Sequence, residues 1–205
     1  MTLSLTVEYD QIFIIDCLTE EQFNDWGISQ DLMQHLADNG IQQATSICRN
    51  KKLVIATLQH LVKLAASGTK FCLHIVSHGD ENGLWIETSN EDITWNEFRD
   101  YLKNINSSMG GTLTVNMTSC LGLHGIKIVD EKSVVLPFFG LIGYSEDLEV
   151  DRGKEINNLF YKKLLDGKQI NEAVDEIKME LSDMSFYCMS SVGNKAIKNT
   201  LSRYK

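Results

Sequence analysis

Long apolar runs and basic residues are both scarce in this chain, and each shortage excludes a class of protein. The longest apolar stretches are Ile12 to Ile15 and residues 134–143, and the second is interrupted by Pro137, the only proline. Neither approaches the roughly 20 residues that a membrane-spanning helix needs. The first ten residues lack the basic and apolar segments of a signal peptide. We therefore expect a cytoplasmic protein with no membrane partner.

The charge balance and the cysteines restrict the partners and the compartment further. Nineteen Lys and Arg against 28 Asp and Glu give a net charge of −9. Direct nucleic-acid binding is not expected, because phosphate contacts need clustered basic side chains. The five cysteines are odd in number and show no paired spacing, which indicates free thiols in a reducing compartment.

The hydrophobic pattern predicts one α/β domain that covers residues 1–205. A chain of this length can bury the core of one domain but is short for two. Apolar runs predict strands, and apolar positions at helical spacing predict helices. The polar stretch 20–50 is expected to hold loop and a helix at 31–38. The strands are expected at 12–15, 71–76, 83–87, 113–117 and 138–144, and the other helices at 53–65, 94–105, 156–164 and 170–181. This alternation indicates a mostly parallel sheet with helices on both faces.

Two reactive side chains follow neighbouring strands in this prediction. His78 comes directly after the strand 71–76, and Cys120 comes directly after 113–117. In open α/β sheets the ligand site lies beyond the carboxyl ends of the strands. If the two strands pair, both side chains enter one crevice. Gly79 and Gly122 flank them and would let a substrate backbone approach closely.

A cysteine beside a histidine is the arrangement that thiol-based acyl transfer requires. The thiolate is the nucleophile, and the imidazole can protonate the leaving amine. The backbone N–H groups of Gly79 and Cys120 are candidates for an oxyanion hole, in which each donor is worth about 3 kcal/mol. No cofactor is needed for this chemistry.

The ordered pair of motifs resembles a known family. Ser77-His78-Gly79 after one apolar strand and Ser119-Cys120-Leu121-Gly122 after another resemble the caspase-like cysteine peptidases, with the bacterial CHAT domain nearest. The resemblance covers roughly residues 53–180. His78 and Cys120 are 42 residues apart, close to the ~50 of the caspase pattern. Gly83-Leu84-Trp85 and Phe138 to Tyr144 also have counterparts in CHAT domains.

The resemblance implies a fold, an activity and a substrate. The fold would be a three-layer sandwich, and the activity would be that of a cysteine endopeptidase acting on a protein, in a bacterial stress or defence setting. Thr118-Ser119-Cys120 replaces the caspase Gln-Ala-Cys, so aspartate specificity is not expected. Resemblance to members that cleave after Arg or Lys suggests an acid in the S1 pocket, with Asp16 first and Asp147 or Glu146 next. CHAT proteins often carry helical-repeat sensors, and none is found here, so the regulator is expected to be a separate chain or a ligand. Of these two, we expect a protein partner.

Three alternatives remain at this stage. The chain could be a catalytically silent caspase-like module that only binds a partner. It could be an unrelated doubly wound protein, although it lacks a Gly-x-Ser-x-Gly elbow, a P-loop and a dinucleotide fingerprint. A zinc site could also be drawn from five side chains, but no metal-ligand spacing supports it, and we predict no metal site. Those five are Cys72, His74, His78, Cys120 and His124.

Overall fold

The computed structural model describes residues 9–130 and 132–194, and its centre is a six-stranded sheet. The strand order is β2-β1-β3-β7-β8-β9, and all neighbours are parallel except β8 and β9. The predicted α/β class with a mostly parallel sheet is confirmed. The strands are β1 (Gln11–Asp16), β2 (Gln43–Ile47), β3 (Phe71–Val76), β7 (Thr114–Thr118), β8 (Gly140–Tyr144) and β9 (Phe186–Ser190).

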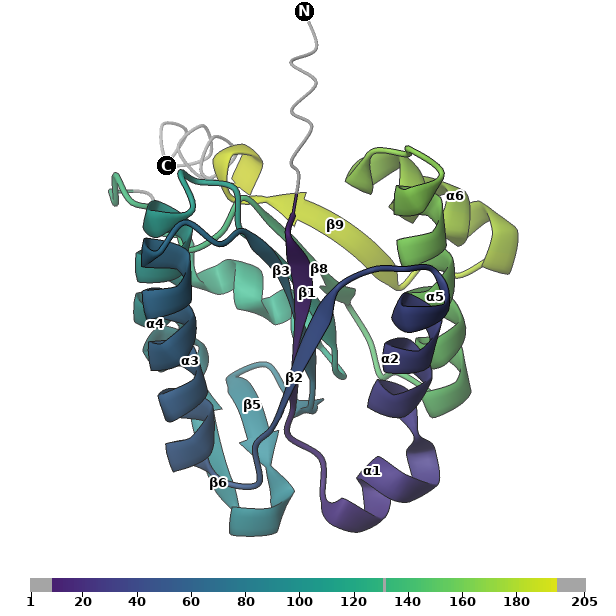
Figure 1. Ribbon diagram of the computed structural model, residues 1–205, viewed down its shortest axis with the longest axis horizontal. Helices are drawn as coiled ribbons and strands as arrows, with labels where there is room; N and C mark the ends of the chain where they lie inside the picture. Colours follow the sequence, from purple (N-terminus) through teal and green to yellow (C-terminus); the bar gives the residue numbers. More distant parts are fainter. Residues whose placement is uncertain (1–8, 131, 195–205) are drawn as a thin grey trace, which may run out of the picture.

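Helices cover both faces of this sheet and make a three-layer sandwich. One layer holds α3 (Lys51–Ala66) and α4 (Trp95–Ser108), and the other holds α2 (Ile28–Asp38), α5 (Val150–Leu165) and α6 (Ile170–Leu181) (Figure 1). Side chains alternate between the two layers along each strand, because successive residues of a strand point to opposite faces. In β1, Phe13 and Ile15 join the core on the α3 and α4 side, whereas Ile12 and Ile14 join the other core. No helix in the described part of the chain is long and apolar enough to cross a membrane.

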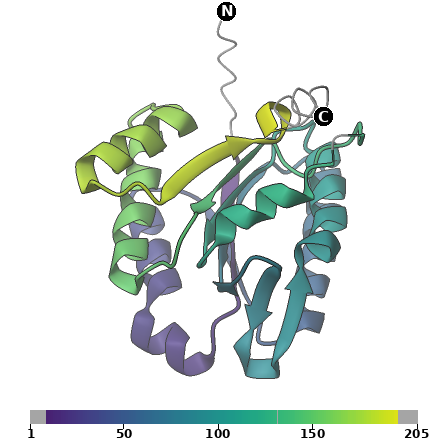
Figure 2. The ribbon, with the colours of Figure 1, turned by 180° about the vertical axis from the view of Figure 1, so that it is seen from behind.

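A small antiparallel sheet lies beyond the carboxyl ends of the parallel strands (Figure 2). It consists of β4 (His78–Gly79), β5 (Gly83–Ile86) and β6 (Glu91–Thr94), with the short 3-10 helix η1 (Glu87–Ser89) between the last two. The predicted extended segment at 83–87 corresponds to β5. Gly83 is required there, since a Cβ atom on it would lie 2.2 Å from the carbonyl oxygen of Ile93.

The segment 20–50 holds more regular structure than the sequence pattern predicts. Besides α2, it forms α1 (Glu20–Trp26) and the edge strand β2, which were expected as loop. No residue of helix α1 is fully buried, so the helix adds no apolar run to the core that a sequence pattern could show. Strand β2 is half-buried and mostly polar, and it is held by its pairing with β1. Strand β9, which pairs with β8, was also not predicted.

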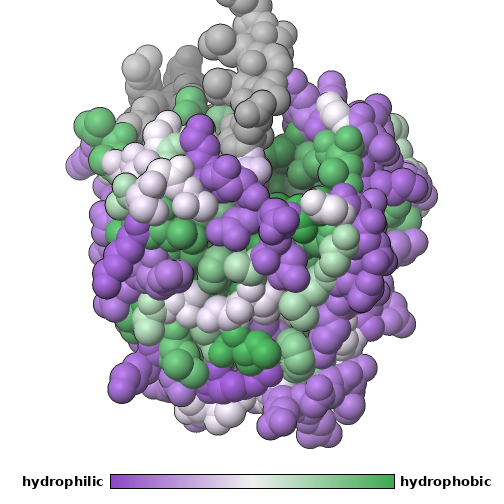
Figure 3. Space-filling model, viewed as in Figure 1, coloured by the Kyte–Doolittle hydropathy of each residue, from purple (hydrophilic) through white to green (hydrophobic). Residues whose placement is uncertain are grey.

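The face that carries the β2 edge shows why this strand is hard to recognise. In Figure 3 hydrophilic residues dominate the two helical flanks, and hydrophobic residues show between them. Four of the five residues of β2 are partly exposed, and Ile47 is 46% exposed. Because the strand is not buried, its sequence does not need the apolar run that marks a central strand.

A chain of buried polar groups joins β3, β7 and α5. The imidazole of His74 lies 2.8 Å from the Tyr161 hydroxyl through Nδ1 and 3.0 Å from Thr118 Oγ1 through Nε2. Thr118 in turn donates to Asn157 Oδ1 at 3.0 Å. The Thr118 hydroxyl has a single proton, so it accepts from Nε2–H and His74 accepts from Tyr161. The chain therefore runs in one direction and satisfies both imidazole nitrogens.

Burial keeps this imidazole neutral. His74 is fully buried, and the loss of water lowers its pKa from 6.5 to about 3. The same effect raises the pKa of Tyr161 well above its usual value. Both rings thus hold the protonation states that the hydrogen-bond chain needs at neutral pH. Cys72, on the same strand, is also buried, so both residues belong to the core.

His74 makes folding stability sensitive to mild acid. Below pH 6.5 the unfolded chain takes up a proton on His74, whereas the folded chain excludes it down to about pH 3. We expect this residue alone to remove about 2 kcal/mol of unfolding free energy between pH 6.5 and 5. His74→Gln should lose that part of the pH dependence in urea titrations at both pH values. His60→Gln, on the exposed side of α3, should keep it, and equal slopes in all three proteins would contradict the assignment.

Candidate active site

The ends of β3 and β7 bring His78 and Cys120 to one pocket. The strands pair in parallel with Val76 opposite Thr118, so each candidate residue stands two positions beyond a paired residue. The condition that these strands are neighbours is therefore met. Both residues line the same pocket, and its other walls are mostly apolar. Those walls include Leu18, Trp26, Ile28, Leu148, Glu149 and Val150.

Cys120 lies on a tight turn at the end of β7. Leu121 takes a left-handed conformation with φ 53°, and the chain then enters the 3-10 helix η2 (Gly122–Ile128). A Cβ atom on Gly122 would lie 2.7 Å from Ser119 Oγ, so only glycine fits this turn. The half-buried sulfur accepts a hydrogen bond from the Leu148 N–H at 3.4 Å. The loop after β8 thereby fixes the position of the thiol.

Gly79 packs directly on the peptide that carries Cys120. A Cβ atom built on Gly79 would lie 2.8 Å from the Cys120 carbonyl oxygen. Any larger residue would push the two strand ends apart. This close approach explains why a glycine follows His78. The two predicted oxyanion-hole residues, Gly79 and Cys120, are thus in contact through their backbones.

The Nε2 atom of His78 is contacted by two polar side chains that come from α1 and η1. Nε2 lies 3.1 Å from Gln22 Oε1 and 3.2 Å from Glu87 Oε2. The ring also packs against Trp26 at 5.6 Å and Trp85 at 5.5 Å between centroids. No hydrogen bond joins His78 to Cys120, and both belong to the described residues. Such catalytic contacts commonly tighten only when substrate binds.

Sequence reasoning missed the residues that surround His78. Gln22 and Trp26 lie on α1, in a stretch expected to be loop, and Gln22 is 56 positions from His78. Thr19 and Gln22 form a capping box, and this pattern was a readable signal for the helix. Glu87 lies in η1 just after β5. Nothing in the local sequence indicates that either polar side chain turns toward His78.

Asp16, the first candidate for the S1 acid, is fully buried and already paired. Its carboxylate receives Arg49 Nη1 at 3.0 Å, the Leu18 N–H at 3.0 Å and the Ser29 hydroxyl. It is not among the residues that line the pocket around Cys120. The Asp16 carboxylate forms an ion pair with Arg49 and does not face the pocket.

The other predicted acids, Glu146 and Asp147, are exposed beside the site. The Leu121 N–H donates to the Glu146 carbonyl oxygen at 3.2 Å, which holds this loop against the Cys120 turn. Both acids line a neighbouring hollow that also contains Arg152 and Asp183. Glu149 lines that hollow and the Cys120 pocket together. Sequence reasoning did not select Glu149, although it is the carboxylate that the pocket presents.

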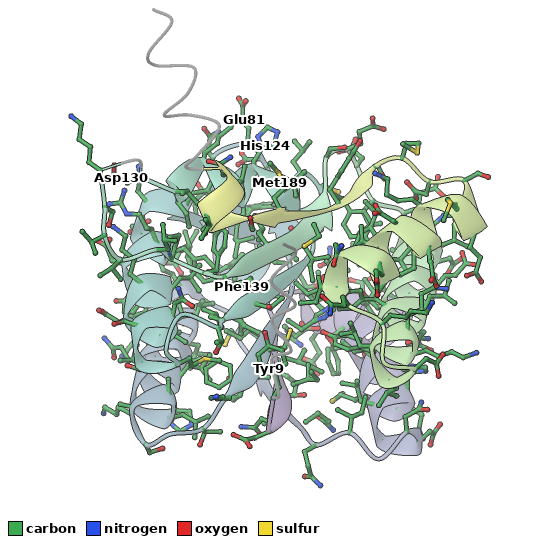
Figure 4. The ribbon with its side chains drawn as sticks, turned by 90° about the horizontal axis from the view of Figure 1, so that it is seen from above. Tyr9, Glu81, His124, Asp130, Phe139 and Met189 are labelled. Carbon is green, nitrogen blue, oxygen red and sulfur yellow. The ribbon has the colours of Figure 1, made fainter. Side chains whose placement is uncertain are left out.

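The remaining zinc candidates are not gathered at this site. Among the described residues no three His, Cys, Asp or Glu side chains are arranged to hold a metal ion. Cys72 and His74 lie within the sheet, and burial raises the pKa of Cys72 to about 12. His124 lies at the periphery of the view in Figure 4, where its Nδ1 accepts from Lys127 Nζ at 2.9 Å. The zinc alternative gains no support.

Comparisons with known proteins leave the family open. No model of a known protein family matches the chain, and no curated protein is similar to it in sequence. The resemblance to caspase-like peptidases therefore stays a prediction that depends on the motifs, the strand order and the pocket.

The contact between Asp16 and Arg49 leads to a prediction about stability. Arg49→Met should leave a fully buried carboxylate without its counter-ion and lower the unfolding free energy by about 3 kcal/mol. Adding Asp16→Asn should restore most of this loss, because the buried charge is then gone. Chemical denaturation measures both.

Arg99→Met is the matched control for Arg49→Met. Arg99 pairs with the exposed Asp100, and such pairs contribute about 0–1 kcal/mol. Equal losses of unfolding free energy in Arg49→Met and Arg99→Met would show that the Arg49–Asp16 contact stabilises the fold no more than an exposed ion pair does.

Proposed function

We propose that this protein is a cytoplasmic cysteine endopeptidase that cleaves a protein substrate with Cys120 and His78. The observation that carries the proposal is the shared pocket at the paired ends of β3 and β7, which both side chains line. The contact between Gly79 and the carbonyl oxygen of Cys120 adds support, since it brings the two strand ends together at this pocket. The presence of both reactive side chains in one pocket favours the peptidase over the catalytically silent module.

The chemistry follows from the groups at the pocket. The Cys120 thiolate attacks the scissile carbonyl carbon, and the carbonyl oxygen becomes an oxyanion that the N–H groups of Gly79 and Cys120 stabilise. His78 gives its proton to the amine as the C–N bond breaks, leaving a thioester on Cys120. Water then attacks the thioester with His78 as general base, which releases the acid and restores the thiol.

A basic side chain fits the pocket best once Glu149 replaces Asp16 as the recognising acid. The apolar walls formed by Trp26, Ile28 and Leu148 suit the aliphatic stem of Lys or Arg. The Glu149 carboxylate lies at the border with the hollow that holds Glu146 and Asp147, where the charged head can remain hydrated. Asp16 contributes little to this recognition because Arg49 occupies it.

A protein partner is proposed to control this site. The loop 145–149 contacts Cys120 through Leu148 and the turn after it through Glu146. A partner that moved this loop would move the thiol, its hydrogen-bond donor and Glu149 together. Regulation would then need no change in the strands that carry the two catalytic residues.

The activity is tested by labelling the thiols. A peptidyl electrophile with Arg at P1 should modify Cys120, and His78→Ala should slow this by at least 100-fold. Burial raises the pKa of Cys188 to about 11 and of Cys72 to about 12, so these thiols stay protonated and slow at neutral pH. Mass spectrometry locates the adduct.

Cys188→Ser is the control, because Cys188 is the other half-buried thiol. It should leave the labelling of Cys120 unchanged. Equal slow labelling of all thiols, with no dependence on His78, would support the silent interaction module instead.

Glu149 provides a separate test of specificity. Glu149→Gln should lower kcat/KM for substrates with Arg at P1 by about 10-fold, because the charge pair is lost at a partly solvated site. Turnover of a matched substrate with Leu at P1 should not change. Asp151→Asn, a carboxylate of the first turn of α5 outside both hollows, should behave as wild type. Wild-type selectivity for Arg in Glu149→Gln would contradict this role.

A further inference from the structure

His78 Nε2 faces two oxygen atoms, and both belong to residues that no catalytic motif of the sequence includes. Gln22 Oε1 is 3.1 Å away and Glu87 Oε2 is 3.2 Å away. They come from α1 and η1, on two different sides of the histidine in the chain. A contact made by two separate elements with the same ring atom needs an explanation beyond local packing.

The orientation of the Gln22 amide is set by contacts other than His78. Its Oε1 accepts from the Thr19 N–H at 3.1 Å in the capping box, and its Nε2 donates to Glu87 Oε2 at 2.5 Å. The oxygen is therefore the atom turned to His78. Since this oxygen and a carboxylate only accept, His78 Nε2 must be the donor and must carry hydrogen.

We propose that Glu87 is the third member of the catalytic group, a positioning residue that holds His78 in the Nε2–H form. Nδ1 is then the nitrogen that exchanges a proton with the Cys120 thiol. When Nδ1 takes the proton, the ring becomes an imidazolium, and the Glu87 carboxylate lies against the new positive charge. Gln22 contacts both partners, since its amide nitrogen donates to Glu87 and its amide oxygen accepts from His78. The role of Glu87 rests on the proposed peptidase function, whereas the Nε2–H form does not.

A merely structural ion pair would behave differently. The Glu87 side chain is 39% exposed and that of His78 is 26% exposed, so their contact contributes little to folding. The ring is already packed between Trp26 and Trp85, which limits its rotation without Glu87. Loss of the carboxylate should therefore affect the chemical step far more than the fold.

The first experiment measures the tautomer and needs no activity. Nitrogen-15 spectra of the ¹⁵N-histidine-labelled full chain, assigned with His78→Ala, measure the tautomer at a pH where the imidazole is neutral. They should show His78 in the Nε2–H form. A dominant Nδ1–H form would overturn the proposal, whether or not the protein is a peptidase.

The second experiment measures the reaction. Glu87→Gln should lower kcat by about 10- to 100-fold with KM within twofold, because the carboxylate acts only when the imidazolium forms. Glu87→Asp should recover part of the rate. Both variants should melt within about 2 °C of the wild type.

Asp92→Asn is the control, since Asp92 is an exposed carboxylate opposite Trp85 in the same small sheet. It should keep the wild-type kcat. Active wild type with an unchanged kcat in Glu87→Gln would overturn the role of Glu87 alone. Wild type that neither turns over nor labels at Cys120 would instead overturn the peptidase function, and with it this role of Glu87, while the tautomer result would stand.

Discussion

The pairing of β3 with β7 is the contact on which the site depends. Val76 lies opposite Thr118, and this register sets the heights at which the chain leaves each strand. A slip of one residue would turn the alternating side chains of one strand to the wrong face, so burial in the two helical layers locks the register. The contact of Gly79 with the Cys120 carbonyl oxygen follows from that register and would be lost with it. The geometry of the two reactive residues is thus a consequence of core packing.

The polar chain through His74 reinforces the same pairing from inside the sheet. It connects β3 to Thr118, two residues before Cys120, and continues to Tyr161 and Asn157 on α5. A buried network that satisfies both imidazole nitrogens of His74 favours one arrangement, because displacing the ring would leave a buried nitrogen without water or a partner. Helix α5 begins at Val150, next to the loop that contacts the Cys120 sulfur. The network thereby couples the strand end to the helix and loop that enclose the pocket.

Three carboxylates near the site differ because their surroundings differ. Asp16 is sealed in the core with Arg49, so its charge serves the fold. Glu149 is exposed at the pocket wall and is open to a charged ligand. Glu87 is partly exposed, and its Oε2 atom contacts both Gln22 and His78. This position suits a carboxylate that would stabilise a positive charge on the imidazole. The residue type alone would not separate these three roles.

The elements that bury apolar side chains could be read from the sequence. The strands at 12–15 and 71–76 and the helix with its Thr94 cap lie where the apolar pattern places them, and the two strand ends identify His78 and Cys120. Helix α1 and strand β2 escape that reading because neither buries an apolar run. Their stability comes from a capping box and from pairing with β1, and only the pairing requires the rest of the fold.

The sequence by itself determined the α/β class and the order in which the histidine and the cysteine leave their strands, because hydrophobic periodicity and chain order are local properties. Only the tertiary structure decided which polar groups meet those two residues. Gln22, Glu87 and Glu149 approach the site from α1, η1 and the start of α5, and Arg49 withdraws Asp16 from it. Contacts between residues so far apart in the chain depend on strand order and packing, which no local pattern encodes.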